Sequence, residues 1–185
     1  MRRLAFLMLT VAACGGNDND SLTSFDGVYT VSTWTDNLTS CAAEGSSVLD
    51  QREPNFYIKT ENFLGVRFVN VVTCADVGDC QAKANEVDTI HLGGFGFDTG
   101  SDETGWRDTS AFGFASNGMC EGTVTETVMT SPASGQIRIE ARSTDAAPFP
   151  VNAAGECPDD AVISAAAGQP CTSFEVVTAS FTTDY

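Results

Sequence analysis

The sequence predicts a single, mainly β domain: one antiparallel β-sandwich or β-barrel with one or two short helices, stapled by disulfide bonds. Segments rich in β-branched and aromatic residues recur through residues 25–185, with turn signals between them. Six of the seven cysteines lie in the same stretch. A hydrophobic content of 42% with 12 phenylalanines supplies enough apolar side chains for a packed core. No internal repeat or interdomain linker divides these residues, so we expect one domain.

The first half of the domain contains three expected strands. Residues 27–34 are β-branched and aromatic and show no helical pattern, and residues 55–60 form a short alternating segment. Residues 64–72 predict the most buried strand. Its expected core face comprises Leu64, Val66, Phe68 and Val72. Residues 35–54 are loop by composition, and residues 80–86 have room for one or two helical turns.

Two Phe-Gly-Phe segments flank an acidic stretch in the middle of the chain. They are Phe95-Gly96-Phe97 and Phe112-Gly113-Phe114. At the two-residue period of a strand, each pair of phenylalanines shares one face. We therefore expect a hairpin with one aromatic face, and Phe95, Phe97, Phe112 and Phe114 are candidate residues for lining an apolar ligand site. A packed core is the simpler interpretation of these phenylalanines.

The last third of the domain predicts a hairpin, a helix and a final strand. The hairpin joins residues 122–130 to residues 136–142 through a turn at residues 131–135. Proline and two acids at residues 158–160, followed by an alanine-rich run and Gly168, have the layout of a short helix. Residues 174–182 predict the closing strand.

The N-terminus has the layout of an export signal. Two arginines precede an apolar run of ten residues, Leu4 to Ala13, which is far shorter than the ~20 residues a spanning helix needs. The run ends in Val11-Ala12-Ala13-Cys14, which resembles the lipobox of bacterial lipoproteins. An ordinary signal peptide is the alternative interpretation. The resemblance implies a leader at residues 1–13, an acylated Cys14 and a polar tether over residues 14–24.

The same resemblance implies where the protein is held. Two or three acyl chains on Cys14 anchor a protein stably, because each buried CH₂ contributes about 0.8 kcal/mol. Gly15 follows the cysteine instead of the aspartate that favours retention at the inner membrane. We therefore expect export and attachment to the outer membrane, with the membrane as a partner through the acyl chains.

The net charge disfavours nucleic acid and anionic lipid as partners. The formal charge of −16 becomes −18 when Arg2 and Arg3 leave with the leader. Such a surface repels phosphate backbones and anionic lipid, so we expect no nucleic-acid binding. It attracts basic partners or divalent cations, although a solvated acidic surface that keeps an exported protein soluble is the simpler interpretation.

The cysteine count agrees with an anchor at Cys14. Removing that residue leaves an even set in an exported protein, which predicts disulfide bonds. The six are Cys41, Cys74, Cys80, Cys120, Cys157 and Cys171. Six thiols allow 15 pairings. Spacing favours Cys74–Cys80, Cys157–Cys171 and, by remainder, Cys41–Cys120. A zinc site is disfavoured because His91 is the only histidine.

Catalytic and metal motifs are weak. Gly-x-Ser-x-Gly is absent from the sequence, and His91 lies between apolar residues, where a structural role is the default. An acidic loop offers oxygen ligands for Ca²⁺, but without the spacing of an EF-hand. These weak candidates are Asp98, Asp102, Glu103 and Asp108. We expect no cofactor and no enzymatic activity; a hydrolase using acidic residues is the most distant alternative.

A second resemblance bears on ligand binding. Gly27-Val28-Tyr29 is similar to the Gly-x-Trp that opens lipocalin-like barrels, and Thr183-Asp184-Tyr185 is similar to another lipocalin tripeptide. The family implies a barrel that holds a small apolar ligand. Our first expectation is a non-enzymatic interaction or structural protein of the cell envelope, with a possible protein partner there. The alternative is a small-ligand-binding barrel.

Overall fold

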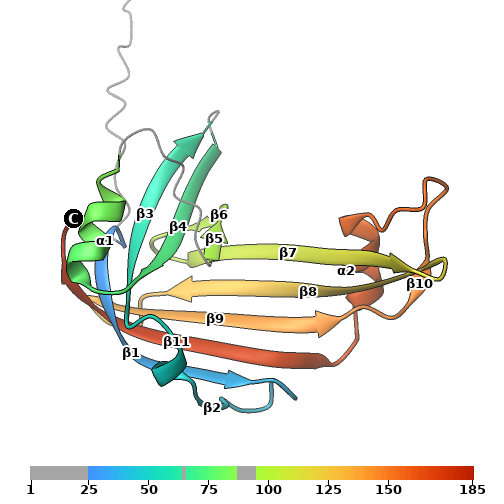
Figure 1. Ribbon diagram of the computed structural model, residues 1–185, viewed down its shortest axis with the longest axis horizontal. Helices are drawn as coiled ribbons and strands as arrows, with labels where there is room; N and C mark the ends of the chain where they lie inside the picture. The colour runs from blue at the N-terminus through green and yellow to red at the C-terminus, as the bar shows by residue number, and fades with distance from the viewer. Residues whose placement is uncertain (1–24, 64–65, 87–94) are drawn as a thin grey trace, which may run out of the picture.

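The computed structural model describes residues 25–63, 66–86 and 95–185, and all its strands belong to one antiparallel sheet (Figure 1). The strands are β1 (Gly27–Asn37), β2 (Ser46–Ser47), β3 (Asn55–Phe63), β4 (Val66–Cys74), β5 (Phe95–Phe97), β6 (Thr99–Ser101), β7 (Gly105–Ser116), β8 (Met119–Thr130), β9 (Gln136–Asp145), β10 (Phe149–Pro150) and β11 (Cys171–Thr183). The helices are α1 (Val77–Ala84), α2 (Asp159–Ala166) and the short 3₁₀ turn η1 (Leu49–Gln51).

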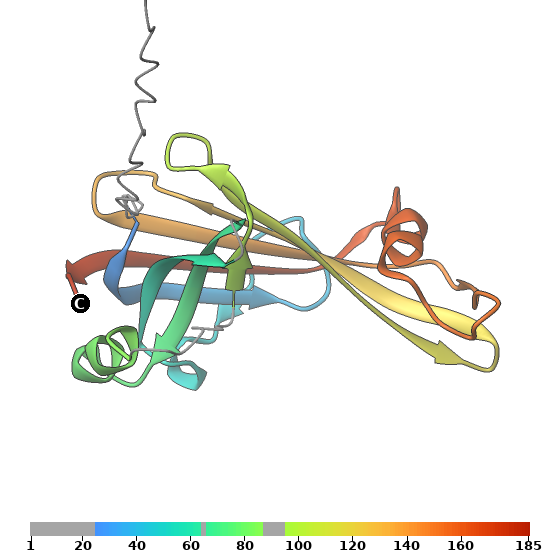
Figure 2. The same ribbon diagram turned by 90° about the horizontal axis from the view of Figure 1, so that it is seen from above.

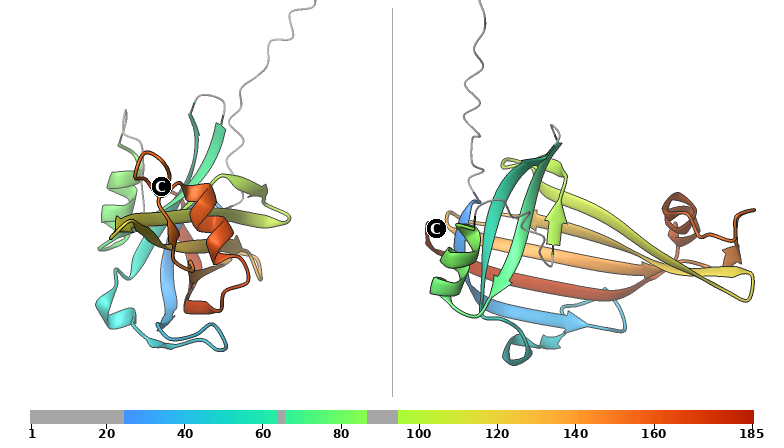
Figure 3. Two further views of the ribbon diagram at one scale, coloured as in Figure 1. Left: turned by 90° about the vertical axis from the view of Figure 1, so that its right-hand side faces the viewer. Right: turned by 45° about the horizontal axis from the view of Figure 1, so that its top comes forward.

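The sheet coils into a nearly closed barrel. Its strand order is β5-β4-β3-β1-β11-β9-β8-β7-β6, with β2 beside β1 and β10 beside β8. Contact between β5 and β7 brings the two ends of the sheet together (Figure 3). The predicted fold class is confirmed, and of the two predicted architectures the barrel is the one formed.

Most strands lie where the sequence predicts them. The strands expected at residues 27–34, 55–60 and 174–182 extend a few residues further, and the hairpin that turns at residues 131–135 is β8–β9. The helix expected after Pro158 is α2, with Asp159 and Asp160 in its first turn, where carboxylates offset the helix dipole.

The predicted core face of the 64–72 strand is wrong. Val69 and Val71 of β4 point into the main core, while Phe68 and Val72 lie on the opposite face and are half-buried. Leu64 and the side chain of Val66 lie outside the described residues. The alternation predicted the wrong face because helix α1 packs on the outer side of the sheet, where Val72 of β4 packs against a buried cluster that includes Cys80 and Ala84. A strand covered on both faces shows no clean polar side.

The predicted pairing of the two Phe-Gly-Phe segments is also wrong. Residues 95–97 form β5 and pair with β4, whereas Phe112 and Phe114 pair with Thr123 and Glu121 of β8. The cause is the two-residue turn after β7. Asn117 and Gly118 have φ values of 51° and 78°, the left-handed pair that a tight hairpin turn requires. This turn therefore pairs β7 with β8.

The β7–β8 hairpin extends well past the barrel (Figures 1 and 2). Its outer part twists away from the barrel and carries α2 and β10 at the far end (Figure 2). We call this projection the distal arm and define it as residues 108–125 together with residues 145–167. A small separate core of Val124, Ala146, Val162 and Ala166 holds α2 on one face of the arm.

Candidate functional site

Within the described residues, the barrel interior holds a packed core of buried side chains. Its core combines aromatic residues from several strands, among them Tyr29, Trp34, Phe56, Phe97 and Trp106, with aliphatic residues from the rest of the sheet. All five are buried. The Tyr29 and Phe56 rings stack with their centroids 5.5 Å apart. The interior therefore resembles the core of a small barrel more than a ligand chamber.

The four candidate ligand-lining phenylalanines do not come together. Phe97 is part of the buried core, and Phe95 is half-buried at the edge of a surface cleft. Phe112 and Phe114 lie on the distal arm, 69% and 48% exposed. The prediction of one aromatic face from these residues is wrong, because the first segment pairs with β4 and the second with β8, at different places in the sheet.

Two glycines determine how α2 sits on the distal arm. Gly113 and Gly122 are cross-strand partners in β7 and β8. A Cβ atom built on either glycine would lie 2.8 Å from a methyl group of Val162 in α2. The Cys120–Cys157 disulfide, which joins β8 to the residue just before Pro158, fixes the start of the same helix. One face of the arm is therefore tightly covered.

The opposite face of the arm is an exposed apolar patch. Since side chains alternate along a strand, Phe112 and Phe114 point away from the glycine face that α2 covers. Their ring centroids are 6.2 Å apart. Met119, 37% exposed, lies on the same face of the neighbouring strand. We call Phe112, Phe114 and Met119 the aromatic patch. The two phenylalanines are candidates that the sequence predicts, whereas no sequence pattern marked Met119, which follows the Asn-Gly turn.

A groove of about 340 Å³ runs beside the aromatic patch. Its lining includes both phenylalanines, Pro148 and two carboxylates, those of Glu121 and Asp145. The Thr123 hydroxyl donates a hydrogen bond to Asp145 Oδ1 at 2.9 Å. Within the described part of the chain, no lysine or arginine forms an ion pair with either carboxylate.

The distal arm carries only negative charge. Residues 108–137 and 143–185 contain neither lysine nor arginine. The arm's carboxylates are those of Asp108, Glu121, Asp145, Glu156, Asp159 and Asp160. In contrast, some acids of the barrel are paired with bases: Arg138 contacts both Glu44 and Glu140, and Arg142 contacts Glu140. These two arginines hold the pKa of Glu140 below its usual value, although burial alone would raise it. The arm therefore combines an exposed apolar surface with nearby acids that have no basic partner in the described structure.

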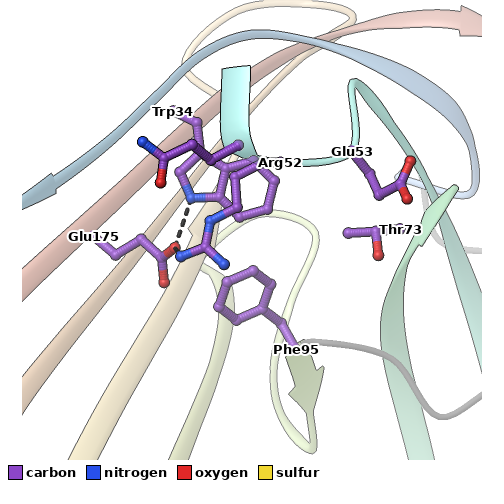
Figure 4. A pocket seen from close by; sticks show the side chains of 7 residues that line it. Trp34, Arg52, Glu53, Thr73, Phe95 and Glu175 are labelled. Atoms are coloured by element: carbon purple, nitrogen blue, oxygen red, sulfur yellow. Dashed lines mark hydrogen bonds and ion pairs between the residues drawn. The ribbon is translucent and has the colours of Figure 1, made fainter. Parts of the chain in front are cut away.

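A second hollow, of about 400 Å³, opens on the barrel wall near η1 (Figure 4). Trp34 donates its indole N–H to Glu175 Oε1 at 2.6 Å. The Arg52 guanidinium lies 5.3 Å from the centre of the Trp34 ring and 3.5 Å from the same carboxylate oxygen. Phe95 completes this side of the cleft, while Glu53 and Thr73 line the other (Figure 4). No sequence motif marks this cluster, because its members come from five separate segments.

The candidate calcium ligands do not form a metal site. Among residues 25–63, 66–86 and 95–185, no group of three acids, cysteines or histidines lies close enough to hold a metal ion. Asp102 instead accepts a hydrogen bond from the Trp106 indole at 3.2 Å. Partial burial, and then the nearby Asp98 carboxylate, raise the pKa of Asp108. Glu103 is exposed in the turn between β6 and β7.

All six candidate cysteines form disulfide bonds, but only one of the three expected pairs is correct. Cys74–Cys80 ties β4 to α1. The other pairs are Cys41–Cys171 and Cys120–Cys157, with Cα atoms 5.7 and 5.6 Å apart, so the predicted Cys157–Cys171 and Cys41–Cys120 bonds are wrong. Pairing of β1 with β11 brings the loop that carries Cys41 beside the start of β11. Disulfide pairing therefore follows which cysteines lie close together in the folded sheet, and not which are closest in the sequence.

Several predicted features lie outside the described residues. These are the leader, the lipidation candidate Cys14 with the tether over residues 14–24, and His91. In the part that the structure describes, both helices are too short to cross a bilayer. Comparison of the chain with protein-family models, curated proteins and solved structures gives no match in any of the three.

Proposed function

We propose that this chain is a lipid-anchored envelope protein that acts without catalysis, using the distal arm to bind a protein partner. The barrel is the rigid support, and Cys14 is the attachment point to the outer membrane. The observation that carries this proposal is the aromatic patch, which lies on a projecting hairpin while the barrel interior is filled. Exposed apolar patches of this kind mark interaction sites more often than scattered surface residues do.

The geometry of the arm supports a recognition role. One disulfide, Cys120–Cys157, and a dedicated helix stabilise a projection whose exposed face has no partner in the described chain. A rigid arm loses little conformational entropy when it binds. A long hairpin also places its patch at the far end of the molecule from α1 and the C-terminus (Figure 1).

Site-specific photo-crosslinking in intact cells tests this proposal. A photoreactive residue replaces Phe114 in the arm or, as the control, Leu38, which is 75% exposed on the barrel side. We expect a discrete crosslinked species from position 114 and none from position 38. Equal products at both positions, or none at position 114, would contradict a partner-binding arm.

The anchor has its own test. Mass spectrometry of the protein extracted from membranes should show residues 1–13 removed and a lipid mass on Cys14. The Cys14→Ser substitution should release the protein from the outer-membrane fraction. An unmodified Cys14 in the extracted protein would contradict the anchor and leave the arm proposal to stand on crosslinking alone.

Small-molecule binding is a second candidate function, favoured by the cleft at Trp34. Its volume of about 400 Å³ falls within the range of ligand pockets, and two aromatic rings flank it. Because the barrel interior is filled, a ligand would lie in this cleft. Titration with the apolar anionic dye 8-anilinonaphthalene-1-sulfonate should then enhance dye fluorescence in the native protein and less in a Phe95→Ala variant. Equal enhancement in both would argue against the cleft.

A further inference from the structure

We propose that the outer edge of β7, residues 108–116, binds an extended basic segment of a protein partner, which adds to the sheet as a further strand. This inference rests on the proposed function of the distal arm and specifies how the arm recognises its partner.

The edge is open in the described structure. On one side β7 pairs with β8 along its whole length, from Trp106 to Ser116. On the other side β6 covers only three residues, Gly105 to Arg107. Although β5 contacts β7, no described strand forms a backbone ladder with the outer edge of β7 beyond Arg107. Alternate backbone N–H and C=O groups along this edge therefore face outward. Such an edge is a template for another strand.

The edge also lacks the devices that block strand addition. Natural edge strands are commonly protected by lysine, proline, a bulge or short length. Residues 108–116 contain no lysine and no proline, and their register with β8 runs without a shift. With nine residues, the open edge is longer than a typical strand. A partner could therefore form several backbone hydrogen bonds along it.

The side chains next to the edge indicate what the partner presents. Phe112 and Phe114 stand on one face of β7 and remain largely exposed. An added strand would place every second side chain beside these rings, where apolar residues would be buried. Main-chain hydrogen bonds would then supply affinity, and the aromatic patch would supply specificity.

The negative charge of the distal arm favours a basic partner over a second copy of this chain. The arm has six carboxylates, including Glu121 and Asp145 in the groove, and no basic residue. Two such arms side by side would repel each other, whereas a segment carrying lysine or arginine would be attracted. We therefore assign the edge to a basic, extended segment in which apolar residues alternate with lysine or arginine.

Binding of three nine-residue peptides to the purified disulfide-bonded protein tests the inference. The first peptide alternates lysine and valine. The second alternates glutamate and valine. The third repeats the first with alternate backbone amides N-methylated, which keeps charge and apolarity but removes the donors for strand pairing. Calorimetry measures affinity at low and physiological salt, and amide exchange by NMR locates the site.

We expect the lysine-valine peptide to bind, to protect amides in residues 108–116, and to weaken as salt rises. N-methylation, or the Phe112→Ser/Phe114→Ser variant, should each weaken binding about tenfold or more. A Leu38→Ser variant, which removes a 75% exposed apolar residue elsewhere, should bind normally. Equal binding of the N-methylated peptide would overturn strand addition, and equal binding of the glutamate-valine peptide would overturn the basic partner.

Two further results separate this inference from the proposed function. Crosslinking from position 114 in cells, combined with no protection of residues 108–116 by the lysine-valine peptide, would keep the arm as an interaction surface and overturn edge pairing. A stable dimer in sedimentation analysis that the Phe112→Ser/Phe114→Ser variant abolishes would assign the edge to a second copy and overturn the basic partner.

Discussion

Gly113 and Gly122 lie directly opposite each other in the β7–β8 hairpin, and their bare backbones form the surface on which α2 rests. The packing of α2 turns a two-stranded ribbon, which is marginally stable alone, into a projecting arm with its own small core. The close approach of Val162 explains why position 113 is a glycine.

The first prediction follows from this contact. Gly122→Ala would bring a Cβ atom to 2.6 Å from the Phe112 carbonyl oxygen and 2.8 Å from Val162, so the strands or α2 must shift. We expect a loss of about 1–3 kcal/mol in the free energy of unfolding, measured by chemical denaturation. Gly96→Ala is the matched control, because its Cβ would lie 3.5 Å from the nearest side chain, an ordinary contact. Equal stability of both variants would mean that α2 does not pack on the glycines.

The second prediction ranks the disulfides. The bonded residues are 130, 37 and 6 positions apart for Cys41–Cys171, Cys120–Cys157 and Cys74–Cys80. Loop-closure entropy then predicts losses of about 5, 4 and 2 kcal/mol when each pair is replaced by alanine. Calorimetric melting of the three double variants checks this order. If Cys74–Cys80 proved the most stabilising, native packing around α1 would dominate over chain entropy.

The third prediction concerns the Trp34–Glu175 hydrogen bond. Glu175→Leu leaves the buried indole N–H without its acceptor, which we expect to cost about 1–3 kcal/mol of stability. Glu175→Gln keeps an oxygen acceptor and should cost less. Arg52→Gln removes only a half-exposed ion pair and its ring contact, for about 1 kcal/mol or less. Denaturation followed by tryptophan fluorescence measures all three, and a reversed order would show that the ion pair matters more than the indole bond.

The fourth prediction is a loss of stability at alkaline pH. Burial and the nearby Asp26 raise the pKa of Tyr29 to about 12, from 10.0 for the free group, and its hydroxyl donates to the Phe25 carbonyl. Because the folded protein holds this proton more tightly, the resulting stability is complete below pH 10 and is lost as pH rises through about 12. Denaturation midpoints between pH 9 and 12 should fall steeply for the native protein and less steeply for Tyr29→Phe. Parallel slopes would contradict the raised pKa.

Ultraviolet titration of tyrosinate checks the same shift directly. The chain has three tyrosines, and burial raises the pKa of each. In the native protein ionisation should therefore lag well behind that of the protein in denaturant. Coincident titration curves would show that the tyrosines are accessible to solvent.

Much of the fold could be predicted from local patterns. Alternating β-branched residues located the strands, and the proline and acids before residues 161–166 located α2, because both signals act over a few residues. The Asn117-Gly118 turn was equally legible, since two left-handed residues between strands specify a tight hairpin. A prediction that used this turn signal would have paired β7 with β8 and separated Phe112 from Phe95.

The candidate site was only half predictable for a different reason. Phe112 and Phe114 could be selected from the sequence, but whether they face a core depends on which strands enclose them. The Trp34 cleft joins residues from β1, the η1 loop, β4, β5 and β11, which are distant in the chain. No local sequence pattern indicates that these residues lie together in the folded protein.

By itself, the sequence determined the β class, the oxidised cysteines, the acidic surface and the approximate place of each strand, because composition and short-range periodicity encode these properties. Only the tertiary structure decided which cysteines bond, which face of β4 is buried, that the barrel is filled and that two phenylalanines stand exposed on an arm with an open edge. These features depend on contacts between distant segments. Such contacts form where packing of the whole sheet stabilises the folded state more than local conformational preferences do.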